Sequence, residues 1–191
     1  FRAEGDAIVL LGSNDGEIGG SEYLKAVHGL VAGDAPALDL ERERSLQQAL
    51  LEAIQAGLVR SAHDCADGGL AVALVESAIG GDARYGIEVE LADDLPTTPL
   101  LFGEAQSRVV ASVAAASVDG LLDIMSRHGV PATVIGRVGP RDGRFRIATR
   151  GGTVEAPIEE LARIYEQAIP RRIEGSAAEV DAALHSEVAL P

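Results

Sequence analysis

Strand-like and helical segments alternate along this chain of 191 residues, and this alternation constrains the fold more than any other feature. Residues 87–91 alternate apolar with acidic side chains, which indicates a strand with one buried face. Residues 6–12 and 108–113 are nearly continuous apolar runs, which indicate buried strands. Several predicted strands follow one another too closely for parallel crossovers. The sequence therefore predicts an α/β (α+β) fold in which helices pack on a mixed sheet.

Helical periodicity and capping residues locate the remaining elements. The longest predicted helix, residues 40–56, has Asp39 as a suitable N-cap and Gly57 as its terminator. Four of its apolar side chains are expected to face the core: Leu46, Leu50, Leu51 and Ile54. Further helices are predicted at 21–30, 70–79, 118–128 and 157–168, and further strands at 132–138 and 145–149, the last in a hairpin around 151–152. We expect residues 1–173 to form one domain and residues 174–191 to form a C-terminal tail.

The composition excludes several classes of protein. Hydrophobic residues make up 47% of the chain but aromatic residues only 3%, so we expect an aliphatic core. The net charge of −14, without a basic cluster, argues against a nucleic-acid partner. No segment approaches the roughly 20 apolar residues of a membrane span, and no signal peptide is recognisable, so we expect no membrane partner and a cytoplasmic location. Because the first residue is Phe, we expect a piece of a longer chain or a processed product.

Residues 61–70, Ser-Ala-His-Asp-Cys-Ala-Asp-Gly-Gly-Leu, concentrate polar chemistry where a turn meets an apolar helix. A carboxylate such as Asp64 can hold Mg²⁺, and Gly68 and Gly69 allow the backbone to approach phosphate oxygens at a helix start. The same stretch is also consistent with a helix cap, in which Asp67 is the N-cap and the glycines permit a tight turn. The local sequence leaves both interpretations open.

Cys65 is the only cysteine, which excludes an internal disulfide and a multi-thiolate zinc site. Its position inside this motif raises the hypothesis of a nucleophile. No second thiol supports that role, and His63 lies only two residues away in sequence. An unreactive thiol is therefore the alternative.

Two further stretches contain unusual combinations of residues. At residues 16–25, Ser21 is expected either to cap a short helix or, with Gly20, to form a backbone anion site at the helix start. Residues 101–110 read Leu-Phe-Gly-Glu-Ala-Gln-Ser-Arg-Val-Val. Their simplest interpretation is a glycine-containing turn before a strand, with Arg108 paired to a local carboxylate.

These motifs resemble, in order and spacing, the C-terminal domain of the aminoimidazole ribonucleotide synthetase superfamily. Ile-Gly-Arg-Val-Gly at 135–139 and Arg-Phe-Arg-Ile at 144–147 belong to the same pattern, which covers nearly the whole chain. Within the superfamily, the chain is most similar to the phosphoribosylformylglycinamidine synthase family. The pair His-Asp-x-x-Asp-Gly-Gly-Leu and Phe-Gly-Glu-x-Gln-Ser-Arg is specific, although either alone is weak. The resemblance implies a three-layer α/β/α domain with a mixed sheet and a partial likeness to ferredoxin-like folds.

The resemblance also implies a part in an ATP-dependent carbon–nitrogen ligase of purine biosynthesis. Whole enzymes of that family convert formylglycinamide ribonucleotide to the amidine with ATP and glutamine-derived ammonia. The implied cofactors are Mg²⁺ and ATP or ADP. The implied partners are the preceding domains of the same chain, a glutaminase subunit and a small regulatory subunit. This domain alone is expected to be inactive, because the family's catalytic residues lie in the preceding domains.

The family pattern assigns roles to individual residues of an auxiliary nucleotide site. Asp64 matches a magnesium-binding aspartate, and Ala66 stands where the family motif has a serine that contacts the nucleotide. Residues 104–106 parallel a Glu-Ser-Gln substrate loop of the family's first half, but they lie in the other half, so no substrate role transfers. The residues expected to contact the nucleotide are Gly20, Ser21, Gly68 and Gly69. No catalytic residue is expected in this chain.

Two alternatives remain open at the level of sequence. The first is another member of the superfamily: aminoimidazole ribonucleotide synthetase itself, thiamine-monophosphate kinase, selenophosphate synthetase or the hydrogenase-maturation dehydratase. The second is a non-catalytic assembly domain that completes an interface. Ala66 is consistent with this second alternative, because a site that has lost its ligand can keep its packing role.

Overall fold

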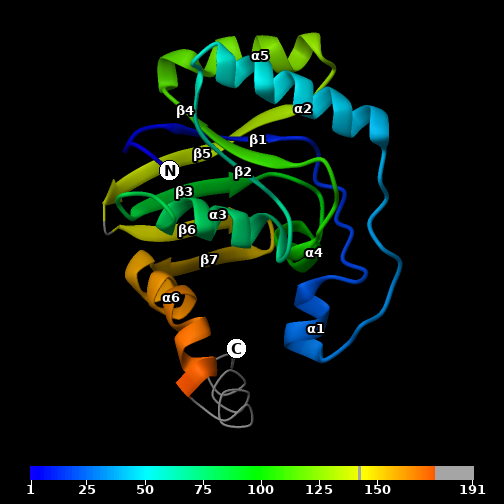
Figure 1. The fold of residues 1–191 in the computed structure, drawn as a ribbon, viewed down its shortest axis with the longest axis vertical. Helices are drawn as coiled ribbons and strands as arrows, with labels where there is room; N and C mark the ends of the chain where they lie inside the picture. Colours follow the sequence, from blue (N-terminus) through cyan, green and yellow to red (C-terminus); the bar gives the residue numbers. More distant parts are fainter. Residues whose placement is uncertain (142, 175–191) are drawn as a thin grey trace. The chain divides into compact units, whose positions relative to one another are not determined.

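Within the residues that the computed structural model describes, 1–141 and 143–174, the strands form one seven-stranded sheet (Figure 1). Its spatial order is β2-β4-β1-β5-β3-β6-β7. All neighbouring strands run antiparallel except β3 and β6, which run parallel, so the prediction of a mixed sheet is confirmed. The strands are β1 (Ala7–Leu11), β2 (Val59–Asp64), β3 (Tyr85–Leu91), β4 (Val109–Val113), β5 (Ala132–Arg141), β6 (Arg144–Thr149) and β7 (Gly152–Pro157).

Helices cover both faces of this sheet, as the three-layer prediction requires (Figure 1). On one face, α2 (Leu40–Gln55) and α5 (Val118–Arg127) pack on β1 and β4 through an aliphatic core that includes Leu121 and Met125. On the other face, α3 (Gly69–Ile79) contacts β2, β3 and β4, and the short α4 (Thr97–Phe102) lies against it. A 3₁₀ turn, Ala115–Ser117, leads into α5. The remaining helix of this unit, α1 (Glu22–His28), follows β1.

The chain divides into two compact units, Phe1–Ile158 and a second that begins at Glu159. Helix α6 (Ile158–Glu174) begins at the last residue of the first unit, and its other residues are the described part of the second. This helix confirms the one predicted at 157–168. Residues 175–191, almost the whole of the predicted tail, lie outside the described residues. None of the helices described is long and apolar enough to span a bilayer.

Three details differ from the sequence-based expectations. Strand β2 was not predicted, because its inward side chains include a serine and a histidine rather than a run of aliphatic residues. Helix α4 was not predicted, because its first residues are Thr, Thr and Pro, which do not indicate a helix. The buried face of α2 is rotated from the expected one: Leu51 and Ile54 are exposed, and small side chains are buried instead. The buried residues of α2 are Leu46, Ala49 and Ala53.

Candidate functional site

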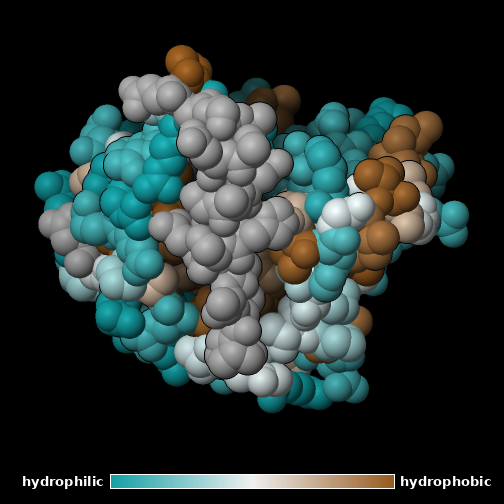
Figure 2. All heavy atoms as spheres, turned by 90° about the horizontal axis from the view of Figure 1, so that it is seen from below, coloured by the Kyte–Doolittle hydropathy of each residue, from teal (hydrophilic) through white to brown (hydrophobic). Residues whose placement is uncertain are grey.

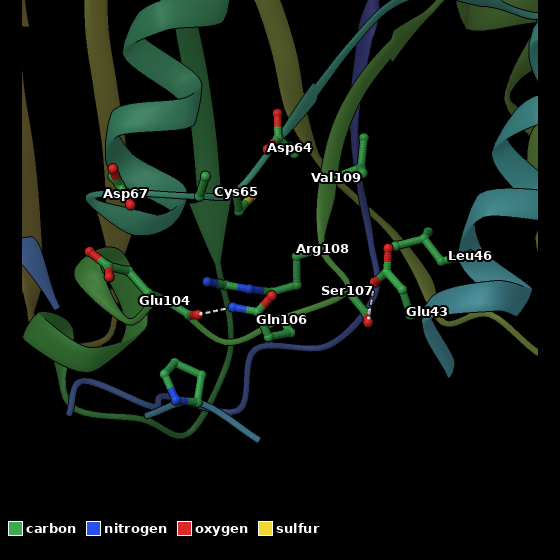
Figure 3. A pocket seen from close by; sticks show the side chains of 12 residues that line it. Glu43, Leu46, Asp64, Cys65, Asp67, Glu104, Gln106, Ser107, Arg108 and Val109 are labelled. Carbon is green, nitrogen blue, oxygen red and sulfur yellow. Dashed lines mark hydrogen bonds between the residues drawn. The ribbon is translucent and has the colours of Figure 1, made fainter. Parts of the chain in front are cut away.

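The end of β2 and the start of β4 meet at a cavity of about 270 Å³ (Figure 3). The two strands are antiparallel neighbours, and Asp64 pairs with Val109 at this end of the ladder. The sheet therefore brings together the two motifs that carried the family resemblance, which lie some forty residues apart in sequence. The lining residues are Asp64, Cys65, Ala66 and Asp67 after β2; Glu104, Gln106, Ser107, Arg108 and Val109 before and in β4; and Pro36, Glu43 and Leu46 from and before α2.

The carboxylate of Glu104 joins the N-termini of two helices. Its Oε1 accepts hydrogen bonds from the backbone N–H of Gly68 at the start of α3 (2.8 Å) and of Glu22 at the start of α1 (2.9 Å). The first N–H groups of a helix lack partners and carry partial positive charge, so an anionic acceptor stabilises both helix ends. The prediction that Asp67 caps α3 is wrong. Its N-cap residue is Gly68, without a side-chain cap bond, and the acceptor comes from Glu104, 36 residues later.

Arg108 holds the turn that presents Glu104. The side chain is only 3% exposed. Its guanidinium donates to the carbonyls of Gly103 (2.6 Å) and Ala105 (3.1 Å) and to the side-chain oxygen of Asn14 (3.0 Å). In the described part of the chain it forms no ion pair with a carboxylate, so the predicted pairing is wrong. Burial lowers the pKa of this guanidinium from its usual value. The turn at residues 103–105 thus closes around a buried cation, and Glu104 projects from it.

Close packing accounts for the Gly68-Gly69 pair. Both glycines have positive φ, +80° and +68°, a conformation that residues with a Cβ rarely adopt. A Cβ on Gly69 would lie 2.5 Å from the carbonyl oxygen of Gly103. The N–H of Gly69 donates to the carbonyl of Ala66 (3.0 Å), while that of Gly68 is bound to Glu104. The start of α3 is therefore pressed against the same turn that Arg108 organises.

Ser21 caps α1, which confirms one of the two interpretations of residues 16–25. Its hydroxyl accepts from the N–H of Leu24 (3.4 Å) and donates to the carbonyl of Ile18 (2.7 Å). Its own N–H also donates to Ile18 (3.3 Å), and the N–H of Gly20 donates to Ala32 (2.8 Å). Each of the four residues expected to contact a nucleotide therefore donates its backbone N–H inside this domain.

Asp64 and its sequence neighbours differ sharply in accessibility. The carboxylate of Asp64 is exposed. The ring of His63 contacts both Asp64 and α3: its Nδ1 lies 2.8 Å from the carbonyl oxygen of Asp64, and its Nε2 lies 3.2 Å from a carboxylate oxygen of Glu76. Cys65 is buried, which raises the pKa of its thiol to about 11. The thiol is therefore protonated near neutral pH, and the nucleophile hypothesis has no support. Among the described residues, no group of three or more His, Cys, Asp or Glu side chains could hold a metal.

The sequence of the domain that holds this cavity matches a known protein family. The family model described as "AIR synthase related protein, C-terminal domain" matches residues 3–148. The chain belongs to this family. The resemblance seen in the sequence motifs is confirmed, and all residues that line the cavity of Figure 3 lie within the matched range.

Curated relatives of this AIR synthase-related domain are much longer than the chain. It is 51% identical over 171 residues to the phosphoribosylformylglycinamidine synthase subunit PurL of Moorella thermoacetica, which covers 89% of this chain and 23% of that protein. It is 40% identical over 191 residues to the subunit of the same name from Anaeromyxobacter dehalogenans, covering 96% of this chain and 24% of that protein. The chain thus spans about a quarter of the length of these relatives.

A solved structure described as T. maritima PurL complexed with ATP shares the fold. The match has a TM-score of 0.66 and 25% sequence identity, and it covers 85% of this chain and 26% of that one. The predicted α/β class with a mixed sheet is confirmed by this likeness as well as by the sheet itself.

Two contacts that shape the site of the AIR synthase-related domain could not be predicted from the sequence. The first is Glu104 as a shared cap, which no local pattern signals because its two partners lie far away in the chain. The second is the hydrogen bond that the Ser107 hydroxyl donates to the Glu43 carboxylate (2.6 Å), which ties the turn before β4 to helix α2. Ser107 has a positive φ of 58°, so this contact accompanies a strained backbone.

Proposed function

We propose that this chain is the C-terminal domain of a phosphoribosylformylglycinamidine synthase, an ATP-dependent ligase. The whole enzyme converts formylglycinamide ribonucleotide to formylglycinamidine ribonucleotide with ATP and glutamine-derived ammonia. The 51% identity to a subunit of that name, across 89% of this chain, carries the proposal. It also distinguishes this reading from the kinases and synthetases of the same superfamily.

The proposal places the domain inside a larger cytoplasmic assembly. The other domains of the subunit precede it, and separate glutaminase and small regulatory subunits complete the enzyme. The length of the relatives supports the presence of other domains in the subunit. A Thermotoga maritima structure described as PurLQS, 25% identical with a TM-score of 0.65, supports the presence of the separate subunits. The domain contributes no catalytic residue, so the chain alone has neither synthetase nor ATPase activity.

Within this domain, Asp64 supplies a Mg²⁺ ligand of an auxiliary nucleotide site. Asp64 is an exposed carboxylate among the residues that line the cavity; such a group suits a hard cation, and Mg²⁺ bound there would neutralise nucleotide phosphates. The starts of α1 and α3, where Glu104 already binds as an anion, would supply the backbone groups that contact the phosphates. The backbone groups there belong to Gly20, Ser21, Gly68 and Gly69.

A second function, that of a non-catalytic assembly domain, is favoured by one specific observation. All four of those backbone N–H groups have acceptors inside the domain, so a phosphate must replace an existing bond to reach any of them. Ala66, in place of the family's serine, points the same way. A measurement of nucleotide binding distinguishes a domain with an auxiliary nucleotide site from a purely assembly domain.

The activity is tested on the full-length subunit with Mg²⁺, ATP and ammonium, by following phosphate release with and without formylglycinamide ribonucleotide. Release that depends on this substrate, and that is lost when residues 1–191 are deleted, is expected. Release indifferent to the substrate overturns the proposal. ATP turnover by the 191-residue chain alone contradicts its assignment as a domain without catalytic residues.

The auxiliary site is tested by calorimetric titration of Mg²⁺·ADP into the full-length subunit. Asp64→Asn is expected to abolish one class of binding. Asp123→Asn, an exposed aspartate on α5, serves as the matched control and leaves it unchanged. Equal binding by both variants removes Asp64 from the site, and no binding to either variant or to the parent favours the assembly function.

A further inference from the structure

The end of α1 and the segment that follows it expose large aliphatic side chains. Val27 is 42% exposed, Leu30 52% and Val31 86%. We call these three residues the α1 apolar patch. The exposure continues along the same segment at Leu38, before α2. Figure 2 shows hydrophobic side chains gathered on this side of the molecule, around α1 and the connection to α2.

The position of α1 is fixed even though it contributes nothing to the core. Within the described part of the chain, none of its residues is buried. Its N-terminus is nevertheless held by Glu104 and by the Ser21 cap. The ring of Tyr23 stacks on Phe102 of α4 at a centroid distance of 4.8 Å. These contacts hold the helix in one place and leave its last turn, with the patch, facing outward.

A patch held in this way differs from scattered surface leucines. Single exposed apolar residues are ordinary on a protein surface, whereas several together mark a contact surface. Val27 lies on α1, and Leu30 and Val31 follow its C-cap, where the N–H of Leu30 donates to the carbonyl of Leu24 (3.0 Å). The three patch residues lie within five positions of the chain. The neighbouring α1 residues Glu22 and Lys25 pair with each other (2.9 Å), so the helix offers no excess charge to an ionic partner. The surface is suited to an apolar protein face.

We infer that the α1 apolar patch is the surface on which the other domains of the full-length subunit pack. This inference rests on the proposed function, because the partner it names is the rest of that subunit. The length of the relatives supports this occupant, since about three quarters of each lies outside the stretch that this chain matches. Docking there also fixes α1 from its far end, and through Glu104 it supports the start of α3 and the wall of the cavity.

Cysteine labelling of the full-length subunit tests the inference. Val31→Cys is reacted with N-ethylmaleimide in the native and in the urea-unfolded protein, and the modified site is quantified by mass spectrometry. Cys65 gives little background in the native domain, because it is buried and the pKa of its thiol is about 11. Native Val31→Cys is expected to react at least roughly tenfold more slowly than the unfolded protein, as covered sites do. Equal rates overturn the inference, since Val31 is freely exposed in this domain.

Ser126→Cys, on the exposed surface of α5, is the matched control and is expected to react at nearly its unfolded rate. A second copy of the subunit is the competing occupant. Protection of Val31→Cys that disappears on dilution, together with a fall in the measured mass in solution, overturns the inference in favour of that copy. Protection that persists in a monomer upholds it. The readout needs no turnover, so an inactive subunit with a protected Val31→Cys refutes the proposed activity alone.

Discussion

Helices α1 and α3 begin at the same carboxylate and yet depend on it to different degrees. Glu104 accepts one backbone N–H from each of the two helix starts. Most of α3 is buried against the sheet, including Leu70 and Leu74, whereas no described residue of α1 is buried. A shared cap is therefore a small addition to a helix that the core already fixes. For α1 it is a main source of order.

The core contribution to α3 gives the largest expected effect. Leu74→Ala removes a fully buried side chain, and we expect a loss of about 2–5 kcal/mol in the free energy of unfolding. Urea unfolding of the 191-residue chain measures it. Val75→Ala, a half-buried position on the same helix, is the control and should be clearly milder. Equal effects of the two would mean that burial does not distinguish the faces of α3.

The close approach of α3 to the turn at Gly103 gives the next effect. Gly69→Ala combines a left-handed backbone with a Cβ 2.5 Å from a carbonyl oxygen, so we expect a loss of roughly 2–4 kcal/mol. Gly129→Ala is the matched control, because Gly129 has the same φ of +68° but nothing within 4 Å of its Cβ position. The difference between the two midpoints in urea isolates the clash. No difference would contradict it.

Removal of the Glu104 carboxylate is the most direct test of how far α1 and α3 each depend on it. Glu104→Ala leaves the N–H groups of Glu22 and Gly68 without their acceptor, and we expect a loss of about 1–3 kcal/mol. Hydrogen exchange should accelerate across α1 and change little across the middle of α3. Glu104→Gln keeps the acceptor oxygen and removes the charge, so it should retain most of the protection of α1. Uniform acceleration in both helices would refute the comparison.

The aromatic contact of α1 gives the smallest expected effect. Tyr23→Ala removes the stacking on Phe102, and we expect a loss of about 0.5–1.5 kcal/mol, again confined to exchange in α1. Tyr23→Phe keeps the ring and should behave like the parent. If Tyr23→Ala leaves exchange in α1 unchanged, the helix is held by its N-terminus alone.

Local patterns predicted the parts of the fold whose causes are local. Ser21 and Asp39 accept hydrogen bonds from backbone groups two or three residues later, so their roles as caps follow from short-range sequence. The apolar runs of β1 and β4 are buried on both faces, as expected. Strand β2 escaped prediction because an edge strand can place a serine or histidine inward. Its pairing with β4 supplies the stability that its composition does not indicate.

The site was predictable only as a list of motifs. The sequence singled out residues 61–70 and 101–110, and the structure places both at one cavity. One interpretation of the sequence made Asp67, the nearest suitable residue, the cap of α3, whereas Glu104 makes that contact from across the turn. The sequence also indicated a carboxylate partner for Arg108, whereas the guanidinium binds backbone carbonyls. The first error arises because packing brings a distant carboxylate to the helix start. The second arises because the buried guanidinium is enclosed by the backbone of its own turn, three to five residues away.

The sequence by itself determined the class of fold, the family and the aliphatic core, because periodicity, capping and motif spacing are properties of neighbouring residues. The tertiary structure alone decided which acceptor the helix starts share, because Glu104 lies 82 positions from Glu22 and 36 from Gly68. It also decided which face of α2 is buried, because the buried face is the one that packs against the sheet and α5. Contacts of that range are set by how whole elements pack, and packing fixed α1 with its apolar patch facing outward.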